Sequence, residues 1–489
     1  MEPLTTTSCN TSTLSPYTPT SGNPWSFGKV QHTFRRLGFG ASEMEIDNAL
    51  SLSPSELIDT IVATAYNLPA TPAPTWGYWA FSDFTDYETE NEQYIYDWRI
   101  ATGNNLISES LRGRMMAFWM NHFVTELDTY FYAPYLFQYA HTLETYVLGN
   151  FKTFVREVGI TPAMLLYLNG FENTNTQPNE NYARELFELF TLGEGNGYTE
   201  TDITETAKAL TGYNHWDEYG GQMYFDSITF VNEDKTIFGQ TGNWGYDDVI
   251  DILFQERGDL IAPFICRKLY QFFVSPDVDA VIEMTIIEPL AQTLIDNNFE
   301  MVPMLKQLFK SEHFYDERAL GVIIKSPFDV IFQFVNESEF PYNNDLMEAF
   351  LYYSGTLGQA LYQPPDVAGW QRDEHWISTS TLTGRWQMFE AYLGILFSNG
   401  QEEIFRELAI SLSNDSIDPE YITQVIVDYF NAKELFTPTD YDIATDIFKW
   451  EIPQNYYDDG LWSLSWDQAP YQVFLLLVHL SKMPEFQLK

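Results

Sequence analysis

The sequence has little cysteine. Only two occur in 489 residues: Cys9 lies in a stretch rich in Thr, Ser and Pro, and Cys266 lies in an apolar run of helical character. This low number excludes a small scaffold held by disulfides, and the two could pair only if the N-terminal stretch folded back. We therefore expect two free thiols, and the low count leaves the cellular compartment open.

Long hydrophobic runs are also missing. The longest near the C-terminus, "VFLLLVHL", is too short to cross a bilayer, which takes about 20 apolar residues. The N-terminus, "MEPLTTTSCNTSTLSPYTPTSGNPW", has no basic start and no apolar stretch typical of a secretory signal. We expect no transmembrane segment and no signal peptide. The localisation is then cytoplasmic by default, with export left open.

Basic residues are few. The chain has 25 Lys and Arg against 69 Asp and Glu, a formal net charge of −44. Such a field repels phosphate backbones and anionic lipid, so we expect no nucleic acid partner. High solubility explains the charge, and the alternative is binding of cations such as Ca²⁺, which takes several oxygen ligands. The sequence has no Asp-x-Asp-x-Asp-Gly loop to support that alternative.

Helical patterning and aromatic residues are abundant. The chain has 37 Phe, 31 Tyr and 13 Trp, and its length is enough for a large core. Neither a fixed-period repeat nor alternating βαβ signals are present. We predict an all-α fold, a multihelix globular array with a small β-like or irregular insertion near residues 213–243. The predicted divisions are an extended arm (1–29), a main helical domain (30–398) and a C-terminal helical subdomain packed on it (399–489).

Capping signals predict several helix starts. A helix is expected from Val30 to about Leu37, and Ser42 is expected to cap the next one. Ser53 and Glu56 form a capping-box pattern with Pro54 at the first helical position. Thr199 is expected to cap a helix that ends by Gly212.

The stretch "PNENYARELFELFTLGEG", residues 178–195, concentrates charge on one helix face. With Asn179 as its predicted N-cap, Tyr182, Leu186, Leu189 and Phe190 share one side, and the polar side carries Glu180, Asn181, Arg184, Glu185 and Glu188. Arg184 can bridge Glu180 and Glu188, because both pairs have i,i+4 spacing. We call Glu180, Arg184 and Glu188 the acidic ridge. It is either a solvated face or, if another segment covers it, a site with perturbed carboxylates.

His122 in "FWMNHFVTEL" is the second candidate. On a continuous helix His122 and Glu126 would face the same ligand, which suits proton transfer or metal binding. The sequence has no HExxH and no pair of CxxC motifs, so we predict no metal ligands. The alternative is a half-buried histidine that hydrogen-bonds a neighbour.

The segment "LYQPPDVAGWQRDEHWISTSTLTGRW" is the most irregular polar part of the chain. A loop stiffened by Pro364 and Pro365 presents Asp366 and Trp370, and Arg385 follows. It is either a ligand platform or a loop whose tryptophans fill the core. The chain contains no G-x-S-x-G, P-loop or dinucleotide motif.

Several runs together resemble a bacterial family known as domain of unknown function 1800. They are "RRLGFGAS", "FWMNHFVT", "LGNFKTFVREV", "TPAMLLYLNG", "PNENYARELFELFTLG", "YTETDITETAKALTGY", "FGQTGNWGYDDVIDIL", "ICRKLYQFFV", "PPDVAGW" and "GRW", with "PEFQL" near the end. The resemblance implies no established activity. It implies that members are often exported and often encoded beside a protein similar to the phosphatase and sulfatase superfamily. Many members have His-Asn-His where this chain has Met120, which weakens a metal site here.

These observations lead to two hypotheses. In the first, the protein is an enzyme, a hydrolase of a polar or glycan-like substrate, with unknown cofactors. Its catalytic groups would be Glu185, Glu188, Arg184 and His122, and its binding groups Glu180, Asn181, Asn121, Asp366, Trp370 and Arg385. In the second, it is a non-catalytic binding or assembly protein that works with the phosphatase-like or sulfatase-like partner.

Overall fold

Local capping signals set where the first helices begin in the computed structural model, which describes residues 13–216 and 220–489. The Ser42 hydroxyl accepts the backbone N–H of Glu45, and the Glu45 carboxylate accepts the backbone N–H of Ser42. Ser53 and Glu56 form the same reciprocal pair. Both predicted helix starts are confirmed.

The first helix is longer than predicted. It begins at Phe27 instead of Val30, because Ser26 holds the extended N-cap conformation and Phe27 already packs against the core. At the acidic ridge the helix start differs by one residue from the prediction of Asn179 as the N-cap, because Glu180 holds the N-cap position without a side-chain cap bond. The helix begins at Asn181, and the Asn179 side chain instead accepts the backbone N–H of Asn181 in the preceding turn.

The described residues are mainly helical, as predicted. The helices of the first half are α1 (Phe27–Leu37), α2 (Glu43–Leu50), α3 (Pro54–Asn67), η1 (Phe81–Asp83), α4 (Tyr87–Ser108), α5 (Leu111–Met120), α6 (Leu127–Tyr130), α7 (Ala133–Tyr146), α8 (Phe151–Gly159), α9 (Pro162–Tyr167), η2 (Gly170–Glu172), α10 (Asn181–Glu185), the π-helix η3 (Leu186–Thr191) and α11 (Glu200–Ala209). Those of the second half are α12 (Tyr246–Phe273), α13 (Ala280–Ile282), the π-helix η4 (Glu283–Ile287), α14 (Glu288–Asp296), α15 (Met301–Phe309), α16 (Pro327–Ser338), α17 (Asn344–Thr356), η5 (Asp373–Trp376), α18 (Thr379–Ser398), α19 (Glu403–Ser413), α20 (Pro419–Phe430), α21 (Pro438–Lys449), α22 (Gln454–Asp458), α23 (Ala469–Leu480) and η6 (Glu485–Gln487).

The insertion predicted near residues 213–243 consists of two small antiparallel hairpins. One pairs β1 (Tyr213–Trp216) with β2 (Met223–Phe225), and the other pairs β3 (Lys235–Ile237) with β4 (Gln240–Gly242). Thr199 caps α11 just before the insertion, as predicted.

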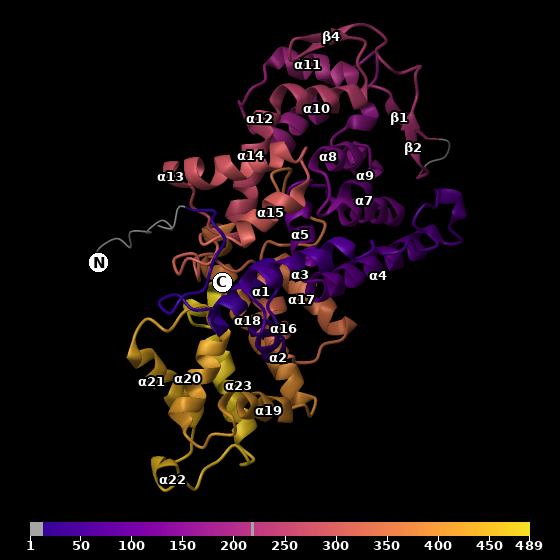
Figure 1. Ribbon diagram of the computed structural model, residues 1–489. Coiled ribbons are helices and arrows are strands. Elements are labelled where there is room, and N and C mark those ends of the chain that lie inside the picture. Colours follow the sequence, from indigo (N-terminus) through magenta and orange to yellow (C-terminus); the bar gives the residue numbers. More distant parts are fainter. Residues whose placement is uncertain (1–12, 217–219) are drawn as a thin grey trace.

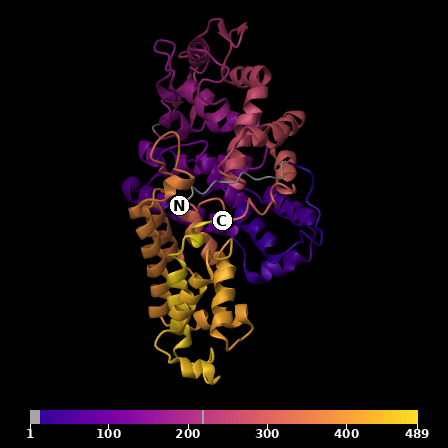
Figure 2. The same cartoon turned by 90° about the vertical axis from the view of Figure 1, so that its left-hand side faces the viewer.

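The helices form an elongated array (Figure 1). α10–α12 and the hairpins lie at one end, and α19–α23 lie at the other, with α1, α3, α5 and α16–α18 between them. The C-terminal helices gather at one end of the molecule, with the short α22 at the tip (Figure 1 and Figure 2), and α23 packs against α18, α19 and α21. The middle layer is where segments from both halves of the chain meet.

Buried ion pairs hold this middle layer together. Arg35 of α1 donates two hydrogen bonds to the Glu337 carboxylate of α16, at 2.5 and 2.9 Å, and a third to the Tyr429 carbonyl of α20. Arg36 donates to the carbonyls of Phe273 and Ala319. The two arginines of "RRLGFGAS" therefore connect α1 to segments about 240 to 390 residues away in the sequence. Both side chains are buried, and buried polar groups need such hydrogen-bond partners.

The end of the chain also returns to the middle layer. The backbone N–H of Lys489 donates to the Ile323 carbonyl at 2.9 Å, and that of Lys325 donates to the Gln487 carbonyl at 2.8 Å. This short pairing places Lys489 beside the start of α16.

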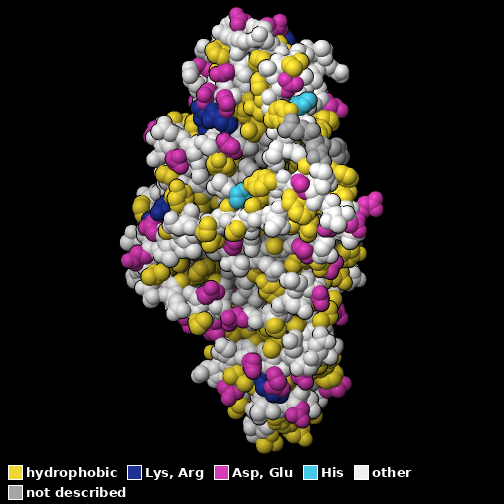
Figure 3. All heavy atoms as spheres, turned by 90° about the vertical axis from the view of Figure 1, so that its right-hand side faces the viewer, with side chains coloured by type: hydrophobic (Ala, Val, Ile, Leu, Met, Phe, Trp, Pro, Cys, Tyr) yellow, Lys and Arg dark blue, Asp and Glu magenta, His cyan; other side chains and the backbone are white. Residues whose placement is uncertain are grey.

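The surface reflects the composition. On the face shown in Figure 3, acidic side chains are dispersed from one end to the other, and few Lys or Arg side chains are visible. Among the described residues, none of the helices combines the length and the apolarity that a bilayer crossing demands.

Candidate functional site

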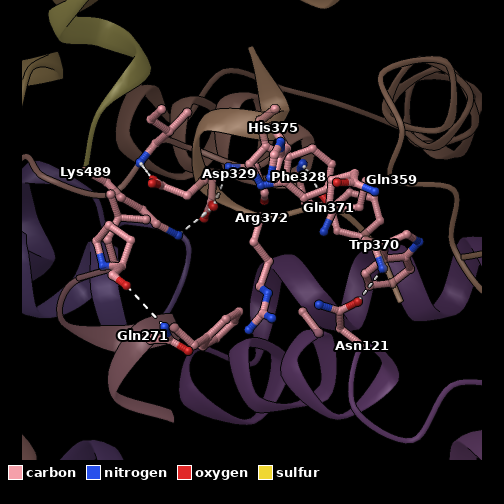
Figure 4. Close-up of a pocket in the computed structure, with 18 of the residues that line it drawn as sticks. Asn121, Gln271, Phe328, Asp329, Gln359, Trp370, Gln371, Arg372, His375 and Lys489 are labelled. Carbon is pink, nitrogen blue, oxygen red and sulfur yellow. Dashed lines mark hydrogen bonds and ion pairs between the residues drawn. The ribbon is translucent and has the colours of Figure 1, made fainter. Parts of the chain in front are cut away.

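A cavity of about 390 Å³ opens in the middle layer (Figure 4). We call it the central cavity. Its walls come from α5, the end of α12, the start of α16, the loop of residues 359–376 and the C-terminal Lys489. Its size and mixture of apolar walls and convergent polar groups are typical of small-molecule sites.

One loop is fixed over the cavity by two predicted site residues. The backbone N–H of Trp370 donates to the Asn121 side-chain oxygen at 2.5 Å, and the Trp370 indole donates to the Ala360 carbonyl at 3.0 Å. Gly369 has a φ of +93°, and a Cβ there would lie 2.2 Å from the Asn121 side-chain oxygen. Asn121 and Trp370 thus lie together on the cavity wall, where Trp370 also packs edge-on against Phe328.

The rear wall is a closed charge network. The Asp329 carboxylate binds Arg114 of α5 and the Lys489 amine, the latter at 2.6 Å, and all three side chains are about 2% exposed. Arg114 also lies between the rings of Phe39 and Phe272, at 4.9 and 4.7 Å from their centroids. These contacts hold the two cations in place.

Arg372 differs from those two cations. Its side chain extends from the loop into the cavity toward Gln271 of α12 and Asn121 of α5 (Figure 4). Within residues 13–216 and 220–489, no hydrogen bond or ion pair of its guanidinium is present. Desolvation lowers the pKa of Arg372, and no carboxylate of the described residues acts to raise it.

Asp373, the next residue, places a carboxyl group on the same cavity. Its backbone has a φ of +50°, a conformation rare for residues other than glycine and often associated with functional sites. The Asp373 carboxylate accepts the backbone N–H of Ile324 at 3.4 Å. Desolvation raises the pKa of Asp373, and the neighbouring carboxylates of Asp277 and Glu374 raise it further.

His122 and Lys268 lie beside the cavity. The His122 ring is 3% exposed, and its Nε2 lies 3.1 Å from the Phe190 carbonyl, so Nε2 carries the proton. His122 Nδ1 therefore accepts a hydrogen bond from the Lys268 amine at 3.0 Å. The pKa of Lys268 is lowered to about 7, mainly by burial and also by the charge of Arg372. Burial also holds the pKa of His122 well below its ordinary value, and the charges of Lys268 and Arg372 act in the same direction.

The π-helix η3 supplies the carbonyls for this pair. The backbone N–H groups of Leu192 and Gly193 both donate to the Phe187 carbonyl, so the carbonyls of Leu189 and Phe190 are left at the helix end. Lys268 takes the Leu189 carbonyl at 3.3 Å, and His122 takes that of Phe190. The motifs around His122, Phe190 and Lys268 therefore meet at one place.

The proposed pairing of His122 with Glu126 on one helix does not occur. α5 ends at Met120, and Glu126 lies at the start of α6. The i,i+4 geometry is lost once the helix stops, and both ring nitrogens of His122 already have partners. Among the described residues, no group of three or more His, Cys, Asp or Glu side chains is arranged to hold a metal ion.

The side chains of the acidic ridge do not line the central cavity. Arg184 contacts Glu188 at 3.2 Å and Glu180 at 3.6 Å, as the spacing predicts, and it also contacts Glu200 of α11 at 2.8 Å. Hydrogen bonding to Glu200 raises the pKa of Arg184 and lowers that of Glu200. The side chain of Glu180 is 44% exposed and that of Glu200 76%, so water reaches much of this network.

The remaining predicted site residues do not line the cavity, and two of them lie near the same tyrosine. Glu185 and Asp366 both act electrostatically on Tyr167, and desolvation raises the pKa of Glu185. The Asn181 side chain donates to that of Asn169 at 3.2 Å. Arg385 is 1% exposed and donates to the Lys325 carbonyl and the Gln487 side chain, so its partners are internal and it does not line the cavity.

Sequence reasoning missed Arg372, Asp373 and Lys268 as site residues. None of them belongs to a periodic pattern or a known catalytic motif. Arg372 and Asp373 stand in "GWQRDEHW", directly after Trp370, so the charges next to that tryptophan were the available signal. Lys268 stands in "ICRKLYQFF" without any distinguishing neighbour.

Comparison with known proteins gave one family. A family model described as "Protein of unknown function (DUF1800)" matches residues 32–488, nearly the whole chain. Neither the curated proteins nor the solved structures gave a match.

Proposed function

The chain belongs to the family of unknown function DUF1800, and from that premise we propose that it is an enzyme that binds a small polar molecule in the central cavity. The observation that carries the proposal is the position of Asp373. Its carboxyl group lines a cavity, its backbone is held in an unfavourable conformation, and burial raises its pKa. A carboxyl group so perturbed suits proton transfer.

In this proposal Asp373 is the general base or acid. For hydrolysis, the reaction class that the sequence suggested, the Asp373 carboxylate accepts a proton from the attacking water and later returns it to the leaving group. The walls of Phe328, Trp370 and Trp376 hold the apolar part of the substrate and exclude bulk water. Asn121 and Trp370, which the sequence pattern predicts as substrate-binding residues, have a different role in this proposal, because they fix the loop.

The first prediction is that Asp373→Asn removes turnover without unfolding the protein. The wild-type chain would be assayed against chromogenic esters, phosphate esters and glycosides, and its rate should fall as pH drops through the raised pKa of Asp373, because the base becomes protonated. Asp373→Asn should lower kcat by about a hundredfold or more while the Tm stays within about 2 °C.

A matched pair tests the acidic ridge as the alternative active site. Glu185→Gln and Glu188→Gln remove carboxylates that do not line the central cavity. If these variants lose turnover and Asp373→Asn keeps it, the catalytic site lies at the ridge and the proposal for the cavity is wrong.

The assembly hypothesis is supported by a different surface. Large apolar side chains are exposed in the loops between the C-terminal helices, among them Phe436 at 80%, Leu461 at 58% and Ile417 at 55%. Such exposure suits contact with another protein. Co-purification with the phosphatase-like or sulfatase-like product of a neighbouring gene, lost in Phe436→Ser, would support this function.

A further inference from the structure

The central cavity holds about as many carboxylates as cations, so its total charge does not identify a ligand. The positions of the charges are more informative. Arg114 and Lys489 are both bound to Asp329, whereas Arg372 has no carboxylate partner within the described parts of the chain. The guanidinium points toward α5 and α12 (Figure 4), and its charge acts on Lys268 of α12.

Lys268 and Arg372 raise the electrostatic potential of the same region. Arg372 lowers the pKa values of both Lys268 and His122, which places its charge near theirs. Lys268 lies one helical turn before Gln271 and Phe272, both of which line the cavity. Among the described residues neither cation forms an ion pair, which is unusual in a protein of net charge −44.

Other groups of this region can donate hydrogen bonds to an anion or pack against it, although the carboxylates of Asp277, Asp373 and Glu374 line the same cavity. Gln271 uses its amide to donate to the Pro276 carbonyl at 3.2 Å, and Asn121 uses its oxygen for Trp370, which leaves the Asn121 amide available as a donor. Phe272 and Ala117 give an apolar floor. His122, with no free acceptor, keeps the Lys268 amine in place, so we regard His122 as a positioning residue.

From these contacts we infer that the α5–α12 side of the central cavity is an oxyanion subsite, in which Arg372 binds the carboxylate or phosphate group of a small ligand with an apolar body, and the nearby charge of Lys268, which does not itself line the cavity, adds to the attraction. The inference rests on the proposed function and narrows its substrate class. An arginine fork fits both kinds of oxyanion, and charge-assisted bonds of this kind are about twice as strong as neutral ones. Displacement of water from the apolar floor adds affinity for the rest of the ligand.

The test is isothermal titration of the full chain with three probes that share a ring: phenyl phosphate, benzoate and benzyl alcohol. We expect phenyl phosphate or benzoate to bind at least tenfold more tightly than benzyl alcohol. Arg372→Gln should reduce that affinity by about tenfold to a hundredfold, and Arg372→Lys should reduce it less, because a charge remains without the fork. Equal binding of the neutral alcohol, or unchanged binding by Arg372→Gln, would overturn the inference.

Arg318→Gln is the matched control, since Arg318 is exposed and does not line the cavity. It should bind the anions as the wild type does. Circular dichroism and the Tm of each variant identify any loss of fold. Should Arg372→Gln unfold, competition by inorganic phosphate against benzoate in the wild type keeps the inference testable, because a shared oxyanion subsite requires competition.

Binding should also depend on pH through Lys268. The groups that face its amine are His122 from the turn after α5, the Leu189 carbonyl from η3, Arg372 from the loop and the Phe264 ring at 5.0 Å. With a pKa of about 7, Lys268 is charged at pH 6 and neutral at pH 8.5, so the anions should bind more tightly at pH 6. Lys268→Met should remove this difference, and a pH profile unchanged by Lys268→Met would contradict the assignment of Lys268.

The outcomes separate the two proposals. If anion binding requires Arg372 but no substrate class is turned over, the oxyanion subsite is supported and the proposed enzymatic activity is rejected. Turnover of neutral substrates that requires Asp373 would support the enzyme and reject the subsite.

Discussion

Lys325 shows how strongly surroundings control a single residue in this fold. Its side chain is 1% exposed, with the amine 4.1 Å from the centroid of the Phe486 ring. The pKa of its amine is lowered to about 7. Burial is the main cause; the charges of Arg35 and Arg385 also lower the pKa, and those of Glu337 and Asp329 oppose this. Protonation of this amine therefore opposes folding.

The second prediction concerns the stability of Lys325→Met. Between pH 7 and about pH 10 the Lys325 amine is protonated in the unfolded chain and neutral in the folded chain. This group therefore raises the free energy of unfolding of the wild type as pH rises, by at most about 1.4 kcal/mol per pH unit. Methionine has no such dependence. The Tm of Lys325→Met should exceed that of the wild type at pH 6, and the difference should shrink by pH 9.

Lys152→Met is the control for this series. Lys152 is about one-third exposed and pairs with Asp251 at 2.7 Å, so its substitution should change the Tm equally at pH 6 and pH 9. A Tm difference for Lys325→Met that is the same at both values would mean that the buried amine does not titrate there.

At the scale of the element, the loop of residues 359–376 decides what the cavity contains. The loop is irregular, so its shape comes from particular contacts of Trp370 and Asn121 rather than from a repeating backbone pattern. Two features require glycine at position 369. Its φ of +93° is unfavourable for other residues, and Asn121 leaves no room for a Cβ.

The third prediction is that Gly369→Ala disturbs this loop. The new Cβ would lie 2.2 Å from the Asn121 side-chain oxygen and 2.8 Å from its carbonyl. We expect a loss of about 1–3 kcal/mol in the free energy of unfolding, measured by urea denaturation, together with loss of anion binding.

Gly394→Ala is the control for this experiment, and we expect it to raise the free energy of unfolding. Gly394 lies inside α18, and a Cβ there meets nothing within 4 Å. Alanine should stabilise the protein by up to about 1 kcal/mol through helix propensity. If both alanine variants behave alike, the close approach of Gly369 to Asn121 does not hold in solution.

At the scale of the whole molecule, the net charge of −44 opposes the compact state. Many of the acidic residues are dispersed over the surface (Figure 3), so their mutual repulsion acts mainly through solvent. Salt shortens the range of such repulsion from about 10 Å at 0.1 M to about 3 Å at 1 M.

The fourth prediction is that the protein gains stability with ionic strength. The Tm should rise by a few degrees, on the order of 2–5 °C, between 0.1 M and 1 M NaCl, because screening relieves the folded state most. Micromolar CaCl₂ at constant ionic strength tests the cation-binding alternative. A large increase in Tm with CaCl₂ alone would reveal a calcium site and would revise the account of the acidic surface.

The sequence by itself determined the local features. The serine caps at Ser42 and Ser53, the contacts of Arg184 with Glu180 and Glu188, and the helical class of the fold all follow from residues a few positions apart. Such features depend on backbone geometry within one or two turns, which the order of residues specifies directly.

Only the tertiary structure decided where the chemistry gathers. Arg114, Asp329, Arg372 and Lys489 meet around one cavity although most of the chain separates them, and Lys268 meets His122 across 146 residues. Whether a charged side chain is screened from water depends on the segments that pack over it, and no local pattern contains that information. For this reason the acidic ridge stood out in the sequence, whereas the unpaired guanidinium of Arg372 did not.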